Sequence, residues 1–486
     1  MLRFLYHNYR FYFMVFFSFT LYAQYPVDTI YLSIATPSAS MPGLRQSLID
    51  NSVPDPVQIT RITEYNTQWD WYPTHEYAKI QPWNANATIY KFYSVAIYDA
   101  RTFQLIRTLP GSEIYPSYWS NTDPDILYGF KENGDLKIYH VQMDSVELID
   151  HIYFDSANHV DYDIFKLGPG EGNIDRFDRF VAFAAKKQTD LYVIVYDLQN
   201  RRIVTTKRFI DAWGNNNSPQ YIDWVSVSQS GQYVGIMWDH NTTDETHPHN
   251  GHYGVEIYDS QNMQFLRRIA RYGNHGDFGY DTSGREVFVQ FWGETGTLNM
   301  YYLDSGERIV LSSHPDFGGE GHISCRNLQR PGYAYVSQDD RSGQMVAVRL
   351  DTTGRFEHFG HHFSSAENYT KSPMPCPSPD GTKVMFKSDF GQANDPDLVY
   401  TFIAQKAPVN AVSSAPFRGW KLYPNPVRNI LHFSLPVHRI ILYDSTGKQI
   451  LNISLETVTY DIDLSILPPG TYFIRTDYGT RLLIKR

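Results

Sequence analysis

Histidine is unevenly distributed along this chain, with ten of the 17 histidines lying between His240 and His362. The densest run is THPHNGHYG at 246–254, which places three imidazoles and a phenol on one expected loop. An imidazole changes charge near neutral pH, and a phenol can donate a proton when a neighbouring cation lowers its pKa. The run therefore predicts His252 and Tyr253 as proton-transfer groups. A solvated histidine-rich loop is the alternative explanation.

A second group of residues suggests metal binding. Cys325 and Cys376 are the only cysteines of the chain, and thiolates combine with neutral imidazoles in tetrahedral zinc sites. His275 and Cys325 hold comparable positions in successive repeats, and His362 and Cys376 belong to the following one. We therefore predict a structural Zn²⁺ site of these four residues. The spacing is no recognised zinc motif, and a Cys325–Cys376 disulfide between adjacent repeats is the alternative.

The elements that must position these residues recur along the chain. Each unit reads as a turn, a strand, a polar loop, a second strand ending near Asp, a further turn and a third strand. Seven units begin near Trp83, Thr122, Arg179, Ser228, Asp281, Arg330 and Ser378. Their spacing of about 40 to 55 residues is typical of four-stranded propeller blades, whereas a β-sandwich would not repeat in this register. We predict an all-β protein with a seven-bladed β-propeller over residues 24–404.

The N-terminus has the pattern of a secretion signal. Arg3 and Arg10 precede an apolar run over residues 11–21, and Ala23 provides a small residue for cleavage. We therefore expect a signal peptide at 1–23. An uncut anchor is the alternative. No other stretch approaches ~18 apolar residues, so we expect no membrane span in the mature form. A net charge of −10 argues against nucleic acid as a partner.

The C-terminus carries three motifs in order: LYPNPVRN at 422–429, ILYDSTGK at 441–448 and LPPGTYFIR at 467–475. They follow a Pro/Ser-containing linker at 405–419 and predict a small β-sandwich at 420–486. An ordinary carbohydrate-binding sandwich is the alternative. The motifs closely resemble the type IX secretion sorting domain. That resemblance implies passage through the periplasm, contact with the type IX secretion machinery, and release or attachment at the cell surface.

The body has its own family resemblance. Four motifs, HEY at 75–77, NHGD at 274–277, GHISCRN at 321–327 and PSPDG at 377–381, look like those of propeller polysaccharide lyases, both ulvan lyases and the oligogalacturonate lyase group. The resemblance implies β-elimination at a uronic acid of an acidic polysaccharide. It also implies His and Tyr as base and acid, Arg or a metal against the carboxylate, and in some members a structural zinc.

These roles can be assigned to residues of this chain. Arg271 could meet the substrate carboxylate, where negative charge develops, and Tyr253 could protonate the leaving oxygen. The base would be His159 or His75, although His75 is equally compatible with packing and a hydrogen bond to the backbone. The chain departs from the oligogalacturonate lyase group at Met374 and Cys376, which replace a His-x-His pair. This change puts a catalytic metal in doubt and favours a structural one.

We therefore expect a secreted monomer that cleaves an ulvan-like or pectate-like glycan. The alternative is a non-catalytic surface propeller that binds glycan or protein.

Overall fold

The computed structural model describes residues 36–68, 70–168, 170–238, 244–271, 275–292, 297–312, 321–337, 343–392, 397–407, 421–445, 448–476 and 479–486. The expected signal peptide, residues 408–419 of the expected linker, and Asn274 of the NHGD motif lie outside these ranges. Within them, no helix is long and apolar enough to cross a membrane.

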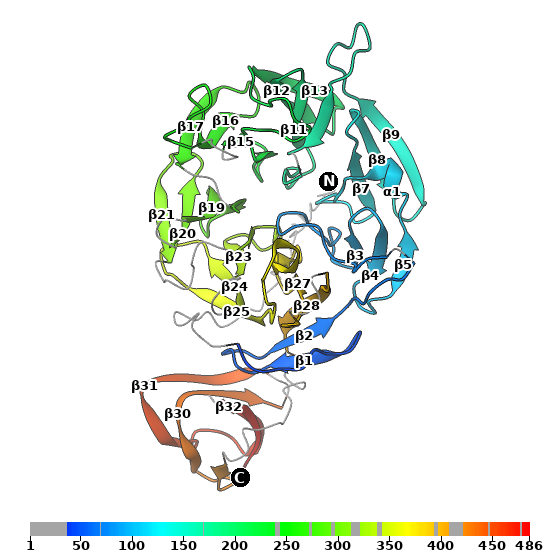
Figure 1. The fold of residues 1–486 in the computed structure, drawn as a ribbon. Helices are drawn as coiled ribbons and strands as arrows, with labels where there is room; N and C mark the ends of the chain where they lie inside the picture. Colours follow the sequence, from blue (N-terminus) through cyan, green and yellow to red (C-terminus); the bar gives the residue numbers. More distant parts are fainter. Residues whose placement is uncertain are drawn as a thin grey trace, which may run out of the picture.

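Within the described residues, seven antiparallel sheets follow one another around a ring, as the repeats predict (Figure 1). Blade 1 contains β3 (Ile89–Phe92), β4 (Ala96–Asp99) and β5 (Leu105–Thr108); blade 2 contains β6 (Ser117–Trp119), β7 (Ile126–Phe130), β8 (Asp135–His140) and β9 (Ser145–His151); blade 3 contains β10 (Ile164–Leu167), β11 (Phe180–Lys187), β12 (Asp190–Asp197) and β13 (Arg202–Phe209); blade 4 contains β14 (Trp224–Val227), β15 (Tyr233–Trp238), β16 (Gly254–Asp259) and β17 (Phe265–Ala270). Blade 5 contains β18 (Asp277–Tyr280), β19 (Glu286–Trp292), β20 (Thr297–Tyr302) and β21 (Arg308–Ser312); blade 6 contains β22 (Ile323–Ser324), β23 (Tyr333–Ser337), β24 (Gln344–Arg349) and β25 (Phe356–His361); blade 7 contains β26 (Cys376–Pro377), β27 (Lys383–Ser388) and β28 (Tyr400–Lys406).

The ring is closed by a hairpin from the N-terminal side of the repeats. β1 (Ser47–Asp50) pairs with β2 (Val57–Arg61), and β2 pairs with β28, which completes blade 7. Val57 and Ile59 are fully buried in the core between blades 6 and 7. The first and last parts of the propeller are thus joined by backbone hydrogen bonds and by apolar packing.

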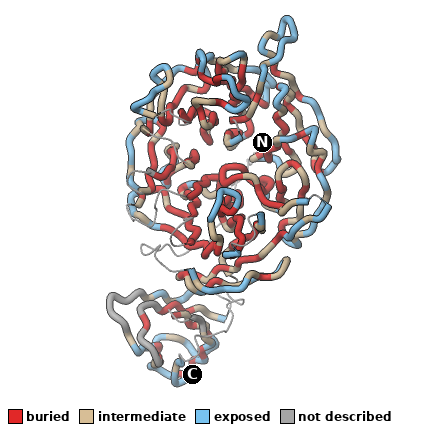
Figure 2. Tube along the Cα trace, viewed as in Figure 1, coloured by how far each residue is buried: buried red, intermediate tan, exposed pale blue. Residues whose placement is uncertain are grey.

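Burial follows the radial order of the strands (Figure 2). The second and third strands of blade 3, β11 and β12, are almost entirely buried, because neighbouring blades cover both of their faces. The outermost strand β13 alternates exposed and partly buried residues. Two short helices, α1 (Gly111–Ile114) and the 3₁₀ helix η1 (Tyr369–Lys371), precede the inner strands of blades 2 and 7.

The axis of the ring is filled by residues 75–81, which we call the axial segment. Its side chains contact groups from all seven blades: Lys91 in blade 1, Tyr118 in blade 2, Glu171 in blade 3, Trp224 in blade 4, His275 in blade 5, His322 in blade 6 and Met374 in blade 7. Such a set of neighbours is available only at the axis.

The C-terminal region forms a separate five-stranded unit with its own core (Figure 1). It contains β29 (Leu422–Tyr423), β30 (Ile430–Asp444), β31 (Gln449–Asp463), β32 (Gly470–Thr476) and β33 (Gly479–Lys485). The unit lies beside the β1–β2 hairpin, where Arg475 Nη1 is 3.2 Å from Asp55 Oδ1 and the guanidinium also donates to the carbonyl of Pro54.

The closing hairpin should carry much of the stability of the propeller. Ile59→Ala removes a fully buried side chain and should lower the free energy of unfolding by about 2–5 kcal/mol in urea titrations. Ile106→Ala, at a largely exposed position of blade 1, is the matched control and should change it by about 0.5 kcal/mol or less. Equal effects of the two changes would contradict this assignment.

Candidate functional site at the propeller axis

All the inner strands begin at one face of the ring, which we call the top face. The residues just before these strands therefore converge on the axis: Tyr115 before β6, Asp223 before β14, His275 before β18, His322 before β22 and Ser372 before β26. The loop 244–253, between the second and third strands of blade 4, is also at this face but farther from the axis.

The centre of the top face is a pair of stacked imidazoles. The rings of His275 and His322 have centroids 4.5 Å apart and are inclined by 21°. His275 Nδ1 donates to the carbonyl of Gly321 at 3.0 Å, so its neutral form carries the lone pair on Nε2. His322 Nδ1 is 3.2 Å from Ser372 Oγ. The hydrogen bonds at Nδ1 orient both rings.

Two tyrosines flank the histidine pair. Tyr77 of the axial segment packs perpendicular to His322, with centroids 5.2 Å apart, and Tyr369 approaches the same ring at 5.7 Å. Burial raises the pKa of Tyr77 well above its usual value. Desolvation, followed by the charge of Glu171, raises the pKa of Tyr369 to about 12. Both phenols are therefore protonated at neutral pH, and the more exposed Tyr369 can donate a proton to a bound molecule.

Two buried lysines hold the axial segment in place. Lys79 Nζ lies 2.5 Å from Glu171 Oε2 and 4.6 Å from the ring centroid of Trp224. Lys91 pairs with Glu76. Glu171 lies in a loop of blade 3 that packs closely against blade 4. A Cβ on the next residue, Gly172, would come within 2.6 Å of the carbonyl oxygen of Val225. Glycine is required there for blade 3 to approach blade 4.

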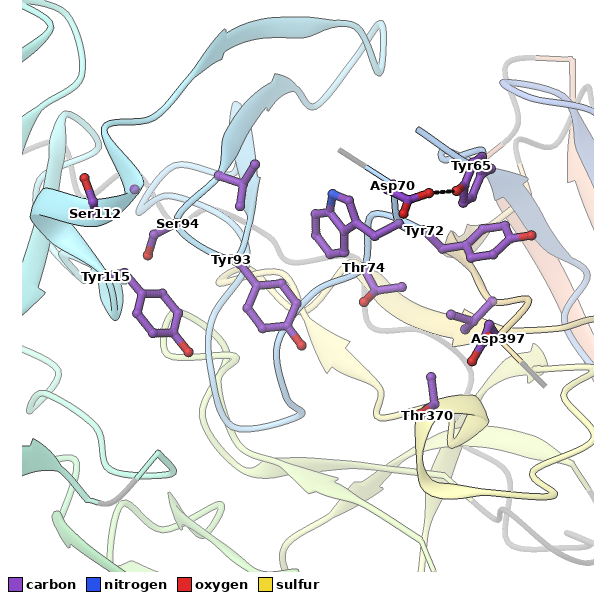
Figure 3. Close-up of a pocket in the computed structure, with 14 residues that line it drawn as sticks. Tyr65, Asp70, Tyr72, Thr74, Tyr93, Ser94, Ser112, Tyr115, Thr370 and Asp397 are labelled. Carbon is purple, nitrogen blue, oxygen red and sulfur yellow. Dashed lines mark hydrogen bonds between the residues drawn. The ribbon is translucent and has the colours of Figure 1, made fainter. Parts of the chain in front are cut away.

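A cleft of about 920 Å³ runs across the top face between blades 7 and 1 (Figure 3). Figure 3 shows Tyr115 and Tyr93 at one end and Tyr72 and Tyr65 at the other, where Asp70 accepts a hydrogen bond from Tyr65. A smaller cavity of about 290 Å³ shares Tyr93 and Tyr115 with this cleft and continues to Tyr77. The cleft therefore leads toward the histidine pair.

The inner cavity is lined by the carboxylates of Glu76 and Glu171 as well as by Tyr77 and Tyr118. Each carboxylate has a buried lysine as its partner, so the cavity walls are close to neutral overall. Tyr77 is the wall that separates this cavity from the imidazoles.

His75, which we expected as a possible base, lies inside the axial segment and is fully buried. Its Nε2 donates to the carbonyl of Met374 at 2.6 Å. Burial, with the charge of Lys387 adding to it, lowers the pKa of His75 to about 3. His75 matches the packing alternative, since a fully buried imidazole cannot reach a substrate.

The histidine-rich loop places its groups away from the axis. His252 stacks on Trp238 at 4.5 Å, and its Nδ1 lies 2.8 Å from Glu256 Oε2. The ring of Tyr253 is covered by the guanidinium of Arg268 at 3.5 Å. Both are tied to the outer strands of blade 4 because the loop connects β15 to β16 and not to an inner strand.

Arg271 and His159 have different positions. Arg271 follows β17 at the top face, four residues before His275, and pairs with Glu245. His159 is exposed in the loop between β9 and β10, where its ring contacts Tyr153 at 5.2 Å. Arg271 therefore lies at the top face beside the loop 244–253, and the structure does not join His159 to the other expected catalytic residues.

The expected zinc set is not assembled. Cys325 directly follows β22 and Cys376 begins β26, the innermost strands of blades 6 and 7. His362 instead follows the outermost strand of blade 6 and accepts from the backbone N–H of Ser364 at 3.0 Å. His275 faces the axis instead. Within the described ranges, no group of three or more His, Cys, Asp or Glu residues could hold a metal ion. This corrects the prediction of a four-residue site.

The disulfide alternative is not present either, since both cysteines are free thiols. Cys325 faces blade 5, where a Cβ on Gly279 would lie 2.9 Å from its sulfur. Cys376 Sγ lies 3.7 Å from the carbonyl oxygen of Ile80 in the axial segment. Burial raises the pKa of both thiols, which keeps them protonated.

Several residues of this centre were not expected from the sequence: Tyr77, Lys79, Glu171 and Tyr369. None belongs to a recognisable motif of its own, although Tyr77 ends the HEY motif. Of the aromatic residues around blades 1 and 2, Trp83, Tyr118 and Trp119 are buried, whereas Trp71 and Tyr115 line the cleft.

Together the fold and its tail define an exported seven-bladed propeller with an axial site. Residues 421–486 match the family described as the secretion system C-terminal sorting domain. The protein is therefore a product of type IX secretion and is released or attached at the cell surface. No curated protein matches the chain by sequence.

Two oligogalacturonate lyases are among the solved structures that resemble the propeller. An oligogalacturonate lyase in complex with manganese has a TM-score of 0.51 and 11% identity, covering 77% of this chain and 98% of that one. The oligogalacturonate lyase of Vibrio parahaemolyticus has a TM-score of 0.50 and 11% identity, covering 75% and 97%. At this identity the likeness shows the fold alone.

The buried state of His75 can be tested through the pH dependence of stability. Between pH 6.5 and about 3 the unfolded chain binds a proton that the folded chain does not, so stability falls as the pH drops through this window. From pH 7 to pH 5, His75→Gln should lose about 2 kcal/mol less than the wild type in urea titrations. His159→Gln, at an exposed position, should behave like the wild type; an unchanged pH loss in His75→Gln would refute the assignment.

The thiols provide a second test. A thiol reagent should modify neither cysteine rapidly in the folded chain and should count two thiols after denaturation without reductant, because both are buried and free. No thiols after denaturation would indicate a disulfide. Stoichiometric release of zinc would indicate a metal site instead.

Proposed function

We propose that this exported protein cleaves a uronic-acid-containing polysaccharide by β-elimination at the top face. The observation that carries the proposal is the stacked pair of His275 and His322, flanked by Tyr369, whose neighbour Thr370 lines the aromatic cleft. The resemblance to oligogalacturonate lyases supports it at the level of the fold.

The site residues suit the two proton transfers of the reaction. His275 Nε2 would remove the proton from C5 of the uronate, since Nδ1 is committed to Gly321. The electron pair forms the C4=C5 double bond as the C4–O4 bond breaks. Tyr369, protonated because of its raised pKa, would give its proton to the leaving oxygen. These assignments replace His75, His159, His252 and Tyr253 in the catalytic roles.

Negative charge develops on the substrate carboxylate during proton removal and requires a cation nearby. We assign this role to Arg271, because it follows β17 at the top face and its partner Glu245 is a side chain that a substrate carboxylate could replace. The manganese of the structural neighbour does not fit the described residues, among which no sufficient cluster of ligands occurs. We therefore assign no step to a metal.

One observation favours the non-catalytic alternative, a surface propeller that binds glycan. Among the described lining residues of the cleft and the inner cavity there is no lysine, arginine or histidine, so a uronate that entered them would find no counter-charge on the walls. An uncharged sugar needs none.

The decisive assay offers ulvan, pectate and other uronic-acid polysaccharides and follows the ultraviolet absorbance of the unsaturated product. We expect activity in the wild type and losses in kcat of about a hundredfold or more in His275→Ala and Tyr369→Phe, with KM little changed.

Tyr253→Phe serves as the discriminating comparison. If it abolishes the rate while Tyr369→Phe does not, the acid lies on the histidine-rich loop. Absence of product on every substrate would leave the binding function.

A further inference from the structure

The walls of the cleft combine aromatic rings with hydroxyl groups. Among the described residues, five aromatic side chains line it: Tyr65, Trp71, Tyr72, Tyr93 and Tyr115. Trp71 and Tyr93 support each other edge to face, with centroids 5.6 Å apart, and Tyr65 and Tyr72 do so at 5.0 Å. Rings held in this way offer flat apolar surfaces that lose little freedom when a ligand packs on them.

The polar groups of the walls are acceptors and hydroxyls. Asp70 and Asp397 line the cleft, together with the hydroxyls of Thr74, Ser94 and Thr370. Farther in, Glu76 and Glu171 line the inner cavity. Among the described lining residues of both spaces there is no lysine, arginine or histidine.

This charge distribution selects against anions. A carboxylate or sulfate lying along the cleft would meet the carboxylates of Asp70 and Asp397 and would find no basic side chain among the described lining residues. A sugar ring, by contrast, presents an apolar face of C–H groups to an aromatic ring and hydroxyls to carboxylate acceptors. Sugar rings without a charge satisfy both requirements.

We propose that the cleft is a binding site for uncharged sugar residues of a polysaccharide chain. The preference for uncharged sugars rests on the proposed function in one respect, because that function places the reacting uronate at the histidine pair. The substrate class is then a heteropolysaccharide in which neutral sugars adjoin the uronic acid on one side. A homopolymer of uronic acid, such as pectate, would fill the cleft with charge and bind weakly.

The test measures binding by calorimetry with the full exported chain. The probes are cellohexaose, xylohexaose, mannohexaose and laminarihexaose as neutral chains, and hexagalacturonate as the charged one. We expect at least one neutral probe to bind, with an affinity that changes little between low and high salt, because no charge pairs form. Hexagalacturonate should bind more weakly than that probe.

Substitutions assign the binding to the cleft. Trp71→Ala and Tyr115→Ala should each weaken neutral binding about tenfold, since truncated aromatic contacts commonly cost that much. Phe177→Ala is the matched control: Phe177 is 49% exposed, close to the 55% of Tyr115, but lies in the turn after the inner strand, at the opposite face. It should leave binding unchanged.

The outcomes separate this inference from the proposed function. Failure of all four neutral probes to bind, or neutral binding that neither cleft substitution weakens, overturns the inference even if the protein is a lyase. Intact neutral binding at the cleft without elimination of any polysaccharide supports the cleft and overturns the lyase proposal instead.

Discussion

The ion pair between Lys79 and Glu171 is the interaction on which the top face of this propeller depends. Both groups are largely removed from water, and such a pair is costly to break because the partner left behind is a buried, uncompensated charge. The pair fixes the axial segment against blades 3 and 4. With that segment in place, Tyr77 reaches the two imidazoles, and the wall between cleft and axis is complete. The seven sheets alone would not fix the positions of the side chains at this centre.

Repeats made the body predictable. A blade is a local unit with its own turns, so its period is visible in the sequence, and the seven units confirm the prediction. The C-terminal domain was equally predictable, because its motifs are specific in sequence and order, and the family match to residues 421–486 confirms it. The closing hairpin β1–β2 was not expected, since its pairing with β28 joins residues more than three hundred positions apart.

The site was predicted less well, and the reason is geometric. Sequence spacing indicates which face of a blade a residue belongs to but not its distance from the axis. Residues just before an inner strand reach the centre, and His275 and His322 follow that rule. His252 and His362 do not, because one precedes a third strand and the other follows a fourth. The axial segment precedes the first repeat and has no counterpart from which its place could be inferred.

The protein combines an external destination with an aromatic cleft whose inner cavity reaches Tyr77, the residue that packs against the two oriented imidazoles. The central proposal is that a polysaccharide chain lies along the cleft and that its uronate meets the histidine pair. The most direct measurement is a crystal structure of the propeller with a bound oligosaccharide that contains both neutral and uronic acid residues. We predict sugar rings stacked along Tyr93 and Tyr115, with the uronate against His275 and His322. Density confined to the blade 4 loop or to the opposite face would contradict the account.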